Sequence, residues 1–230
     1  MTTSSGIPER VDPELVLRID GSRPLTAALV AETNALCARV EDGDASGVAV
    51  LRLSGAPDAL WIHDLAVPLV NKWERALRRL ERLDVATIGV ADGDCGGTAL
   101  EALLATDYRI ATGTVRLLLP GDAGGVWPGM ALYRMANQIG VGAARRTVLR
   151  GLPVPARQAL ELQLVDEVVD DPETGLAEAA ELVGAASGGG IAMRRQLMLD
   201  ASTTSFEDAL GSHLAACDRV LRRVPVGSAS

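Results

Sequence analysis

Residues 91–107 read ADGDCGGTALEALLATD, and the rest of the chain is organised around them. This stretch follows an apolar run, ATIGV at residues 86–90, that is typical of a strand. It ends in leucines at helical spacing, Leu100, Leu103 and Leu104. The glycines between the two segments allow the backbone to turn sharply. The sequence therefore predicts a strand, a tight turn and a helix.

The start of this helix offers several free hydrogen-bond donors. Backbone N–H groups in the first turn of a helix have no partner within the helix, and the helix dipole favours negative charge there. A phosphate or an enolate oxygen suits such a place, and Glu101 lies one turn further on. Two simpler interpretations remain open. The glycines can serve only to make the bend, and Glu101, which falls among apolar positions, can be a partly exposed or salt-bridged residue.

Composition agrees with one enzyme-sized domain. The chain has 230 residues, of which 48% are hydrophobic, so it can bury a large core. The net charge of −8 and the absence of a basic cluster argue against a nucleic-acid surface. Cys37, Cys95 and Cys217 are far apart and odd in number, which favours neither a disulfide framework nor a metal site. Without a signal-like N-terminus or an apolar run of membrane length, we expect a soluble cytoplasmic protein.

The remaining pattern alternates strand-like and helix-like segments. This alternation favours a mainly parallel sheet in an α/β fold. The helix expected over 70–83 carries Trp73, Leu77 and Leu80 on one face. The expected strands are 15–20, 48–53, 86–90, 108–112, 115–119 and 165–169. The other expected helices are 25–40, one after residue 97, 130–140, 142–149, 156–164, 172–186, 191–199 and 206–223.

A family resemblance rests on the central stretch. Gly93 and Gly97, followed by Glu101 and then DYRIA at residues 107–111, resemble the signature of the crotonase (enoyl-CoA hydratase/isomerase) superfamily. Its glycine triplet falls on residues 97–99, where threonine and alanine replace two glycines. The resemblance continues through Pro128-Gly129, Gln138-Ile139-Gly140, LRGLPVPARQA at 149–159 and QLVDEVV at 163–169.

The resemblance implies an α/β crotonase spiral of ββα units with C-terminal helices. We expect a flexible tail at residues 1–13, a crotonase-like core at 14–190 and a shortened C-terminal helical region at 191–230. The family implies an acyl-CoA thioester as substrate, with coenzyme A as part of it and no separate cofactor or metal. It also implies a homo-oligomer, a trimer or hexamer, without nucleic-acid or membrane partners.

In the family, two backbone N–H groups hold the thioester oxygen. Resemblance places these donors at His63 and Thr98, with Trp61, Ile62 and Gly97 in substrate-binding positions. Trp61, Ile62 and His63 are bulkier than the residues that the family usually has there. The His63 side chain either lies on the surface or works as an acid or base, if a carboxylate lies beside it.

Family hydratases also use a second glutamate beside the one matched by Glu101. Counting back from residues 138–140 places Pro120 at that position. Asp122 is the acid nearby, and it either replaces the missing glutamate as a catalytic group or is only a turn residue. Glu101 is thus the one acid in register.

The short chain and altered glycine run most resemble the enoyl-CoA hydratase-like proteins of 3,5-dihydroxyphenylacetyl-CoA biosynthesis, which supplies dihydroxyphenylglycine to antibiotics. The resemblance favours an acyl-CoA dehydratase (a lyase) that stabilises a thioester enolate and aids the dehydration and aromatisation of a polyketide-CoA intermediate. Two alternatives stay open. One is a non-catalytic crotonase-fold partner of a type III polyketide synthase or of another crotonase-like protein. The other is a single-acid enoyl-CoA isomerase.

Overall fold

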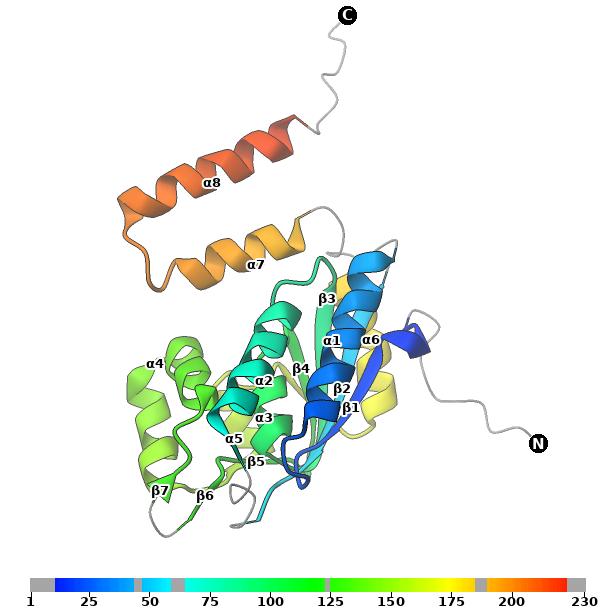
Figure 1. Cartoon of the computed structure of the whole chain (residues 1–230), viewed down its shortest axis with the longest axis vertical. Coiled ribbons are helices and arrows are strands. Elements are labelled where there is room, and N and C mark those ends of the chain that lie inside the picture. Colours follow the sequence, from blue (N-terminus) through cyan, green and yellow to red (C-terminus); the bar gives the residue numbers. More distant parts are fainter. Residues whose placement is uncertain (1–10, 44–46, 59–64, 123–124, 185–189, 223–230) are drawn as a thin grey trace, which may run out of the picture.

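The fold is a twisted, mostly parallel sheet between layers of helices, with two further helices beside it (Figure 1). This computed structural model describes residues 11–43, 47–58, 65–122, 125–184 and 190–222. The strands are β1 (Val16–Asp20), β2 (Val48–Gly55), β3 (Ala86–Gly96), β4 (Tyr108–Thr112), β5 (Arg116–Leu118), β6 (Gly121–Asp122), β7 (Gly125–Val126), β8 (Val154–Pro155) and β9 (Glu167–Val169). The helices are η1 (Pro13–Leu15), α1 (Ala27–Asp42), α2 (Val67–Leu80), α3 (Gly97–Leu103), α4 (Met130–Arg150), α5 (Ala156–Glu161), α6 (Pro172–Gly184), α7 (Ile191–Asp200) and α8 (Phe206–Leu221).

The main sheet has the order β1-β2-β3-β4-β9, and all of these neighbours are parallel. β5 pairs in parallel with the far end of β3, and β8 pairs antiparallel with β5. β6 and β7 form a separate two-stranded ribbon. The prediction of an α/β fold with a mainly parallel sheet is confirmed.

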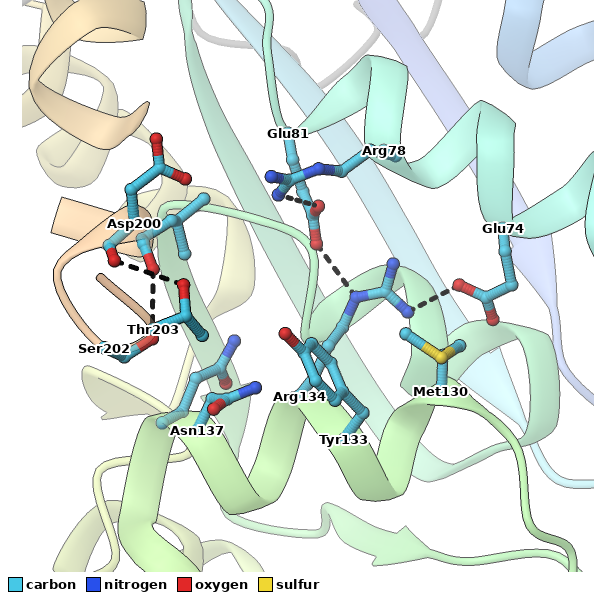
Figure 2. Close-up of a pocket in the computed structure, with 12 residues that line it drawn as sticks. Glu74, Arg78, Glu81, Met130, Tyr133, Arg134, Asn137, Asp200, Ser202 and Thr203 are labelled. Atoms are coloured by element: carbon cyan, nitrogen blue, oxygen red, sulfur yellow. Dashed lines mark hydrogen bonds and ion pairs between the residues drawn. The ribbon is translucent and has the colours of Figure 1, made fainter. Parts of the chain in front are cut away.

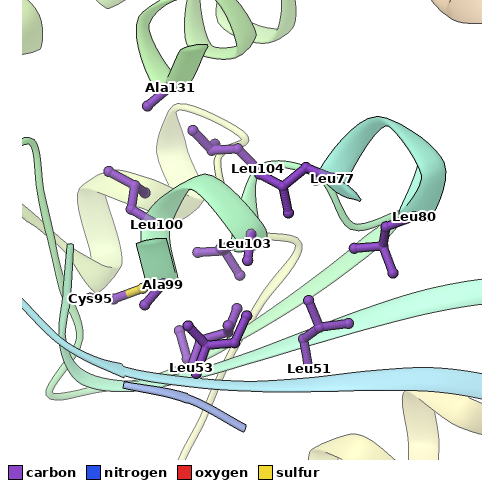
Figure 3. Packing of buried hydrophobic residues seen from close by; sticks show 14 of the residues in the cluster. Leu51, Leu53, Leu77, Leu80, Cys95, Ala99, Leu100, Leu103, Leu104 and Ala131 are labelled. Atoms are coloured by element: carbon purple, nitrogen blue, oxygen red, sulfur yellow. The ribbon is translucent and has the colours of Figure 1, made fainter. Parts of the chain in front are cut away.

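The sheet is buried on both faces, as parallel sheets usually are. Successive residues of β2 point to opposite sides, so Val50 and Leu51 belong to two different core clusters. On one side, leucines of α2 and α3 pack over β2 (Figure 3). On the other side, α6 contributes Leu176. Glu101 and the other residues of α3 therefore lie in the larger core.

β3 is longer than the sequence predicts, because it continues to Gly96 and α3 follows without an intervening loop. The extension is stabilised by pairing of residues 94–96 with β5, a contact that local periodicity does not reveal. Close packing then fixes the start of α3. A Cβ atom at Gly21 would lie 2.2 Å from the Gly96 carbonyl oxygen, so only glycine allows the turn after β1 to pass this close.

The expected helices at 130–140 and 142–149 form one element, α4, with a kink where Gly140 has φ 77°. The helices expected at 191–199 and 206–223 are confirmed as α7 and α8. Arg195 attaches α7 to the core: its Nε donates to Asp107 Oδ1 at 2.6 Å, and its Nη1 donates to the Leu83 carbonyl oxygen at 2.7 Å. α8 packs along α7 (Figure 1).

One residue of the predicted N-terminal tail belongs to the folded core. Val11 is buried, with 3% of its surface exposed. Within the described ranges, every helix is too short or too polar to cross a bilayer. The division of the chain into tail, core and C-terminal region stays a prediction.

Candidate active site

Glu101 lies in the second half of α3 and is buried, with 6% of its surface exposed. Its Oε2 accepts a hydrogen bond of 2.7 Å from Nε1 of Trp73, which lies on α2 and is fully buried. The interpretation of Glu101 as a partly exposed or salt-bridged residue is therefore wrong. Among the described residues, the hydrogen-bond partner that the structure shows for its carboxylate is the neutral indole of Trp73, on α2.

The other carboxylate oxygen of Glu101 faces the start of α4. A Cβ atom at Gly129, the N-cap residue of that helix, would lie 2.8 Å from Glu101 Oε1 and 2.6 Å from Trp127 Nε1. A side chain at this position would therefore push against both groups. Gly129 thus allows the backbone of α4 to approach the carboxylate closely.

Figure 2 shows a cluster of charged side chains between α2 and α4, and the charges of two of them, Glu74 and Arg134, act on Glu101. Arg134 on α4 donates from Nη1 to Glu74 Oε2 at 2.8 Å and from Nε to Glu81 Oε1 at 2.9 Å. Arg78 also donates to Glu81, at 3.0 Å. The side chains of Glu74, Glu81 and Arg134 are 16%, 12% and 7% exposed, so these ion pairs are largely withdrawn from water. Sequence reasoning gave no site role to Glu74 or Arg134. The two residues are 60 positions apart, so no local pattern indicates that they form a pair.

Burial raises the pKa of Glu101 from its ordinary value to about 7. The negative charge of Glu74 also raises this pKa, while the Trp73 hydrogen bond and the positive charge of Arg134 lower it. Burial likewise raises the pKa of Glu74, against the opposing effect of Arg134. A carboxyl group with a pKa near 7 can both accept and donate a proton at neutral pH.

Thr98, a predicted oxyanion donor, is the second residue of α3 and is 2% exposed. A backbone N–H at this position has no acceptor within the helix, and no side chain caps the helix start. The Thr98 hydroxyl is also buried without a hydrogen-bond partner among the described residues. Within the described part of the chain, the Thr98 hydroxyl is thus an unused hydrogen-bonding group at the start of α3.

The other predicted site residues are placed only in part. Gly97 begins α3 with φ 52°, and a Cβ atom there would lie 3.0 Å from Pro57, which leads toward the predicted donor loop. Trp61, Ile62 and His63 lie outside the described residues. Asp122 pairs with Gly125 through the backbone of β6 and β7, and its side chain lies outside the description. Their predicted roles stay predictions.

Glu74 and Arg134 also line a cavity of about 330 Å³ between α2, α4 and the turn after α7. Figure 2 shows Tyr133 and Asn137 on the α4 wall and Ser202 and Thr203 opposite. The volume is in the range of small-molecule sites. Glu101 is not among the residues that line this cavity, and its carboxylate is hydrogen-bonded to Trp73.

The fold and the buried carboxyl group define a crotonase-type α/β protein, and comparisons with known proteins agree. Residues 68–225 match the enoyl-CoA hydratase/isomerase family. An enoyl-CoA-hydratase of Amycolatopsis orientalis is 52% identical over 210 residues, which cover 91% of this chain and 97% of the relative.

Solved structures give the same fold. An enoyl-CoA hydratase/isomerase from Marinobacter aquaeolei superposes with a TM-score of 0.75 at 20% identity, over 90% of this chain and 87% of the other. An enoyl-CoA hydratase from Thermoplasma volcanium gives 0.74 at 18% identity, over 96% and 94%. The chain belongs to the enoyl-CoA hydratase/isomerase family of the crotonase superfamily. It is a hydratase-like protein, and an acyl-CoA thioester substrate is consistent with this family.

Proposed function

We propose that the protein is an acyl-CoA dehydratase that converts a β-hydroxyacyl thioester into an enoyl thioester. Burial of Glu101, with a pKa of about 7, is the observation that carries this proposal. A group of this acidity is half ionised at neutral pH, so it can first act as a base and then as an acid. The backbone N–H groups of His63 and Thr98 are the proposed donors to the thioester oxygen.

The chemistry needs one proton to move and one C–O bond to break. Ionised Glu101 takes the proton from the carbon next to the thioester carbonyl, and negative charge moves onto the thioester oxygen. The two N–H groups stabilise this enolate because their dipoles are already oriented. The enolate electrons then form the C=C bond as the C–O bond breaks. Glu101 returns the proton to the departing hydroxyl, which leaves as water, and Glu101 is ionised again.

We propose a polyketide-CoA intermediate of dihydroxyphenylacetyl-CoA biosynthesis as the substrate, with dehydration leading to an aromatic ring. The altered glycine run at residues 97–99 supports this assignment by resemblance. We also propose a homo-oligomer, a trimer or hexamer as in the family, and a cytoplasmic location. Cys37, Cys95 and Cys217 are all free thiols, which is consistent with a reducing compartment.

Two other functions have some support. Glu101 is not among the residues that line the 330 Å³ cavity, which favours a non-catalytic partner that activates a type III polyketide synthase. One carboxyl group with a pKa near 7 also suits an enoyl-CoA isomerase, which takes a proton from one carbon and returns it to another.

The test compares the wild type with Glu101→Gln, because glutamine keeps an oxygen for the Trp73 hydrogen bond. Glu161→Gln, at an exposed glutamate of α5, is the matched control. Each protein is incubated with a β-hydroxyacyl-CoA, and the loss of water is followed by mass spectrometry. We expect activity in the wild type and the control, with a loss of at least about a hundredfold in Glu101→Gln.

The alternatives predict other results. Exchange of the α-proton into D₂O without loss of water would favour the isomerase. If neither occurs and Glu101→Gln still stimulates a type III polyketide synthase as well as the wild type does, the partner function stands.

A further inference from the structure

Thr98 carries a buried hydroxyl group that the fold itself does not use. The residue is 2% exposed, and its Oγ1 atom is buried with no hydrogen-bond partner among the residues that the structure describes. A buried polar group without a partner costs free energy, so most such groups in proteins are hydrogen-bonded. The Thr98 hydroxyl is therefore a donor, removed from water, that is available to a bound molecule.

Other buried threonines of this protein show how such a hydroxyl is used by the fold. The Thr33 hydroxyl donates to the Leu29 carbonyl oxygen, one turn earlier in α1, at 2.9 Å. The Thr106 hydroxyl donates to the Leu103 carbonyl oxygen at 2.7 Å. Thr98 is the second residue of α3, so the residue four positions before it lies in β3 and not in the helix. Its hydroxyl thus lacks the helical carbonyl oxygen that Thr33 has.

The Thr98 side chain lies on the same face of α3 as the carboxyl group of Glu101. The two residues are three positions apart within the helix, and residues at this spacing are neighbours on one face. Both are buried, Thr98 with 2% and Glu101 with 6% of its surface exposed. The α-carbon and the carbonyl carbon of a thioester are directly bonded. Neighbouring turns of one helix face can therefore act on both.

Covalent geometry brings the hydroxyl close to the backbone N–H of the same residue. In any threonine the nitrogen and Oγ1 are joined through three bonds, by way of Cα and Cβ, so both donors can reach one oxygen atom. The proposed function assigns the Thr98 N–H to the thioester oxygen. The hydroxyl hydrogen rotates about its C–O bond, so it can be directed at the same oxygen.

We propose that the Thr98 hydroxyl is a catalytic group that donates a third hydrogen bond to the thioester oxygen, beside the two backbone N–H groups. This inference rests on the proposed function, in which negative charge develops on that oxygen. The hydroxyl keeps its proton throughout and shares it with the enolate. Its hydrogen bond is stronger to the enolate than to the neutral carbonyl, so it lowers the barrier more than it tightens substrate binding.

The test uses two variants of Thr98 in the full-length chain. Thr98→Val removes the hydroxyl and keeps the shape of the side chain, and Thr98→Ser keeps a hydroxyl. Thr33→Val is the matched control, because Thr33 is also buried and its hydroxyl is paired within its own helix. Each protein is compared with the wild type.

Thermal denaturation shows whether the fold uses the hydroxyl. We expect Thr98→Val to melt at or above the wild-type temperature, because an unpaired buried hydroxyl is removed. We expect Thr33→Val to melt at a lower temperature, because a hydrogen bond is lost. If Thr98→Val loses as much as Thr33→Val does, the hydroxyl serves the fold and the inference is overturned.

Infrared spectroscopy of bound acetyl-CoA, isotope-labelled at its thioester carbonyl carbon, reports hydrogen bonds to the carbonyl oxygen without any reaction. Each such bond weakens the C=O bond and moves its band to lower frequency. We expect a large shift in the wild type, Thr98→Ser and Thr33→Val, and a smaller one in Thr98→Val. Equal shifts in all four proteins, or no band from bound acetyl-CoA in the wild type, would overturn the inference.

The last measurement is the dehydration of a β-hydroxyacyl-CoA. In Thr98→Val we expect kcat to fall by at least about tenfold with a smaller change in KM, and in Thr98→Ser we expect most of the rate to return. If the wild type shows no dehydration while the carbonyl bands differ as expected, the proposed function fails and the hydroxyl stands as a thioester donor. If all four proteins dehydrate the substrate with equal kcat, the proposed function stands and this inference fails.

Discussion

Replacing Glu101 with glutamine should change how stability depends on pH. The pKa of Glu101 is raised from 4.5 to about 7 in the folded protein, mainly by burial. Below pH 4.5 the group is protonated in both the folded and the unfolded chain, and its burial carries no ionisation cost. As the pH rises toward 7, the unfolded chain releases this proton first, so the folded state loses stability relative to the unfolded state.

The size of the effect follows from the two pKa values. One pKa unit corresponds to about 1.4 kcal/mol, so the shift makes folding about 3 kcal/mol less favourable above pH 7. Because part of this cost is already present at pH 5, the change between pH 5 and pH 8 is about 2 to 3 kcal/mol. Glutamine carries no ionisable proton. The free energy of unfolding of Glu101→Gln, relative to the wild type, should therefore rise by that amount over this range.

Urea denaturation followed by circular dichroism measures this difference at pH 5, 6, 7 and 8. Protein concentration must be constant, because assembly changes apparent stability. Titrating groups that do not interact with Glu101 are common to both proteins and cancel in the difference. Stability curves that stay parallel across the range would refute the argument, since they would mean that Glu101 ionises in the folded protein as it does in the unfolded chain.

Three further predictions concern neighbouring contacts. Trp73→Phe removes a hydrogen bond that lowers the pKa of Glu101, so the ionisation seen in the pH–rate profile should move to higher pH. Gly129→Ala places a methyl group 2.8 Å from Glu101 Oε1, and should cost about 1 to 3 kcal/mol in thermal denaturation and reduce kcat. Arg195→Ala removes the ion pair with Asp107 and leaves the carbonyl oxygens of buried Leu83 and Val85 without this donor; it should cost about 1 to 3 kcal/mol and expose α7 to proteolysis.

Matched variants separate these effects from general damage. Gly142 lies within α4, the helix that Gly129 caps, and a Cβ atom there meets open space, so Gly142→Ala should be neutral or stabilising because alanine favours helix. Arg222→Ala removes an exposed ion pair of α8 and should cost less than about 1 kcal/mol. The predictions fail if Gly129→Ala and Arg195→Ala are as mild as these controls, or if the profile of Trp73→Phe moves to lower pH.

Local sequence patterns predicted most of the secondary structure. The helix expected over 70–83 is α2, and its expected apolar face, which includes Trp73 and Leu77, is buried. The strand before the central turn is β3, but its end at Gly96 depends on pairing with β5. Periodicity describes which side of an element is apolar. It does not describe which distant segment will pair with that element, so the ends were the least well predicted.

The sequence by itself determined the superfamily, the α/β class and the place of Glu101 one turn into the central helix, because these depend on the local order and spacing of residues. Only the tertiary structure decided the chemistry of that carboxyl group. Trp73 is 28 positions from Glu101 in sequence, and the Arg134–Glu74 pair spans 60 positions. Burial and charge depend on distances in space, and folding brought α2, α3 and α4 together to give Glu101 a pKa near 7.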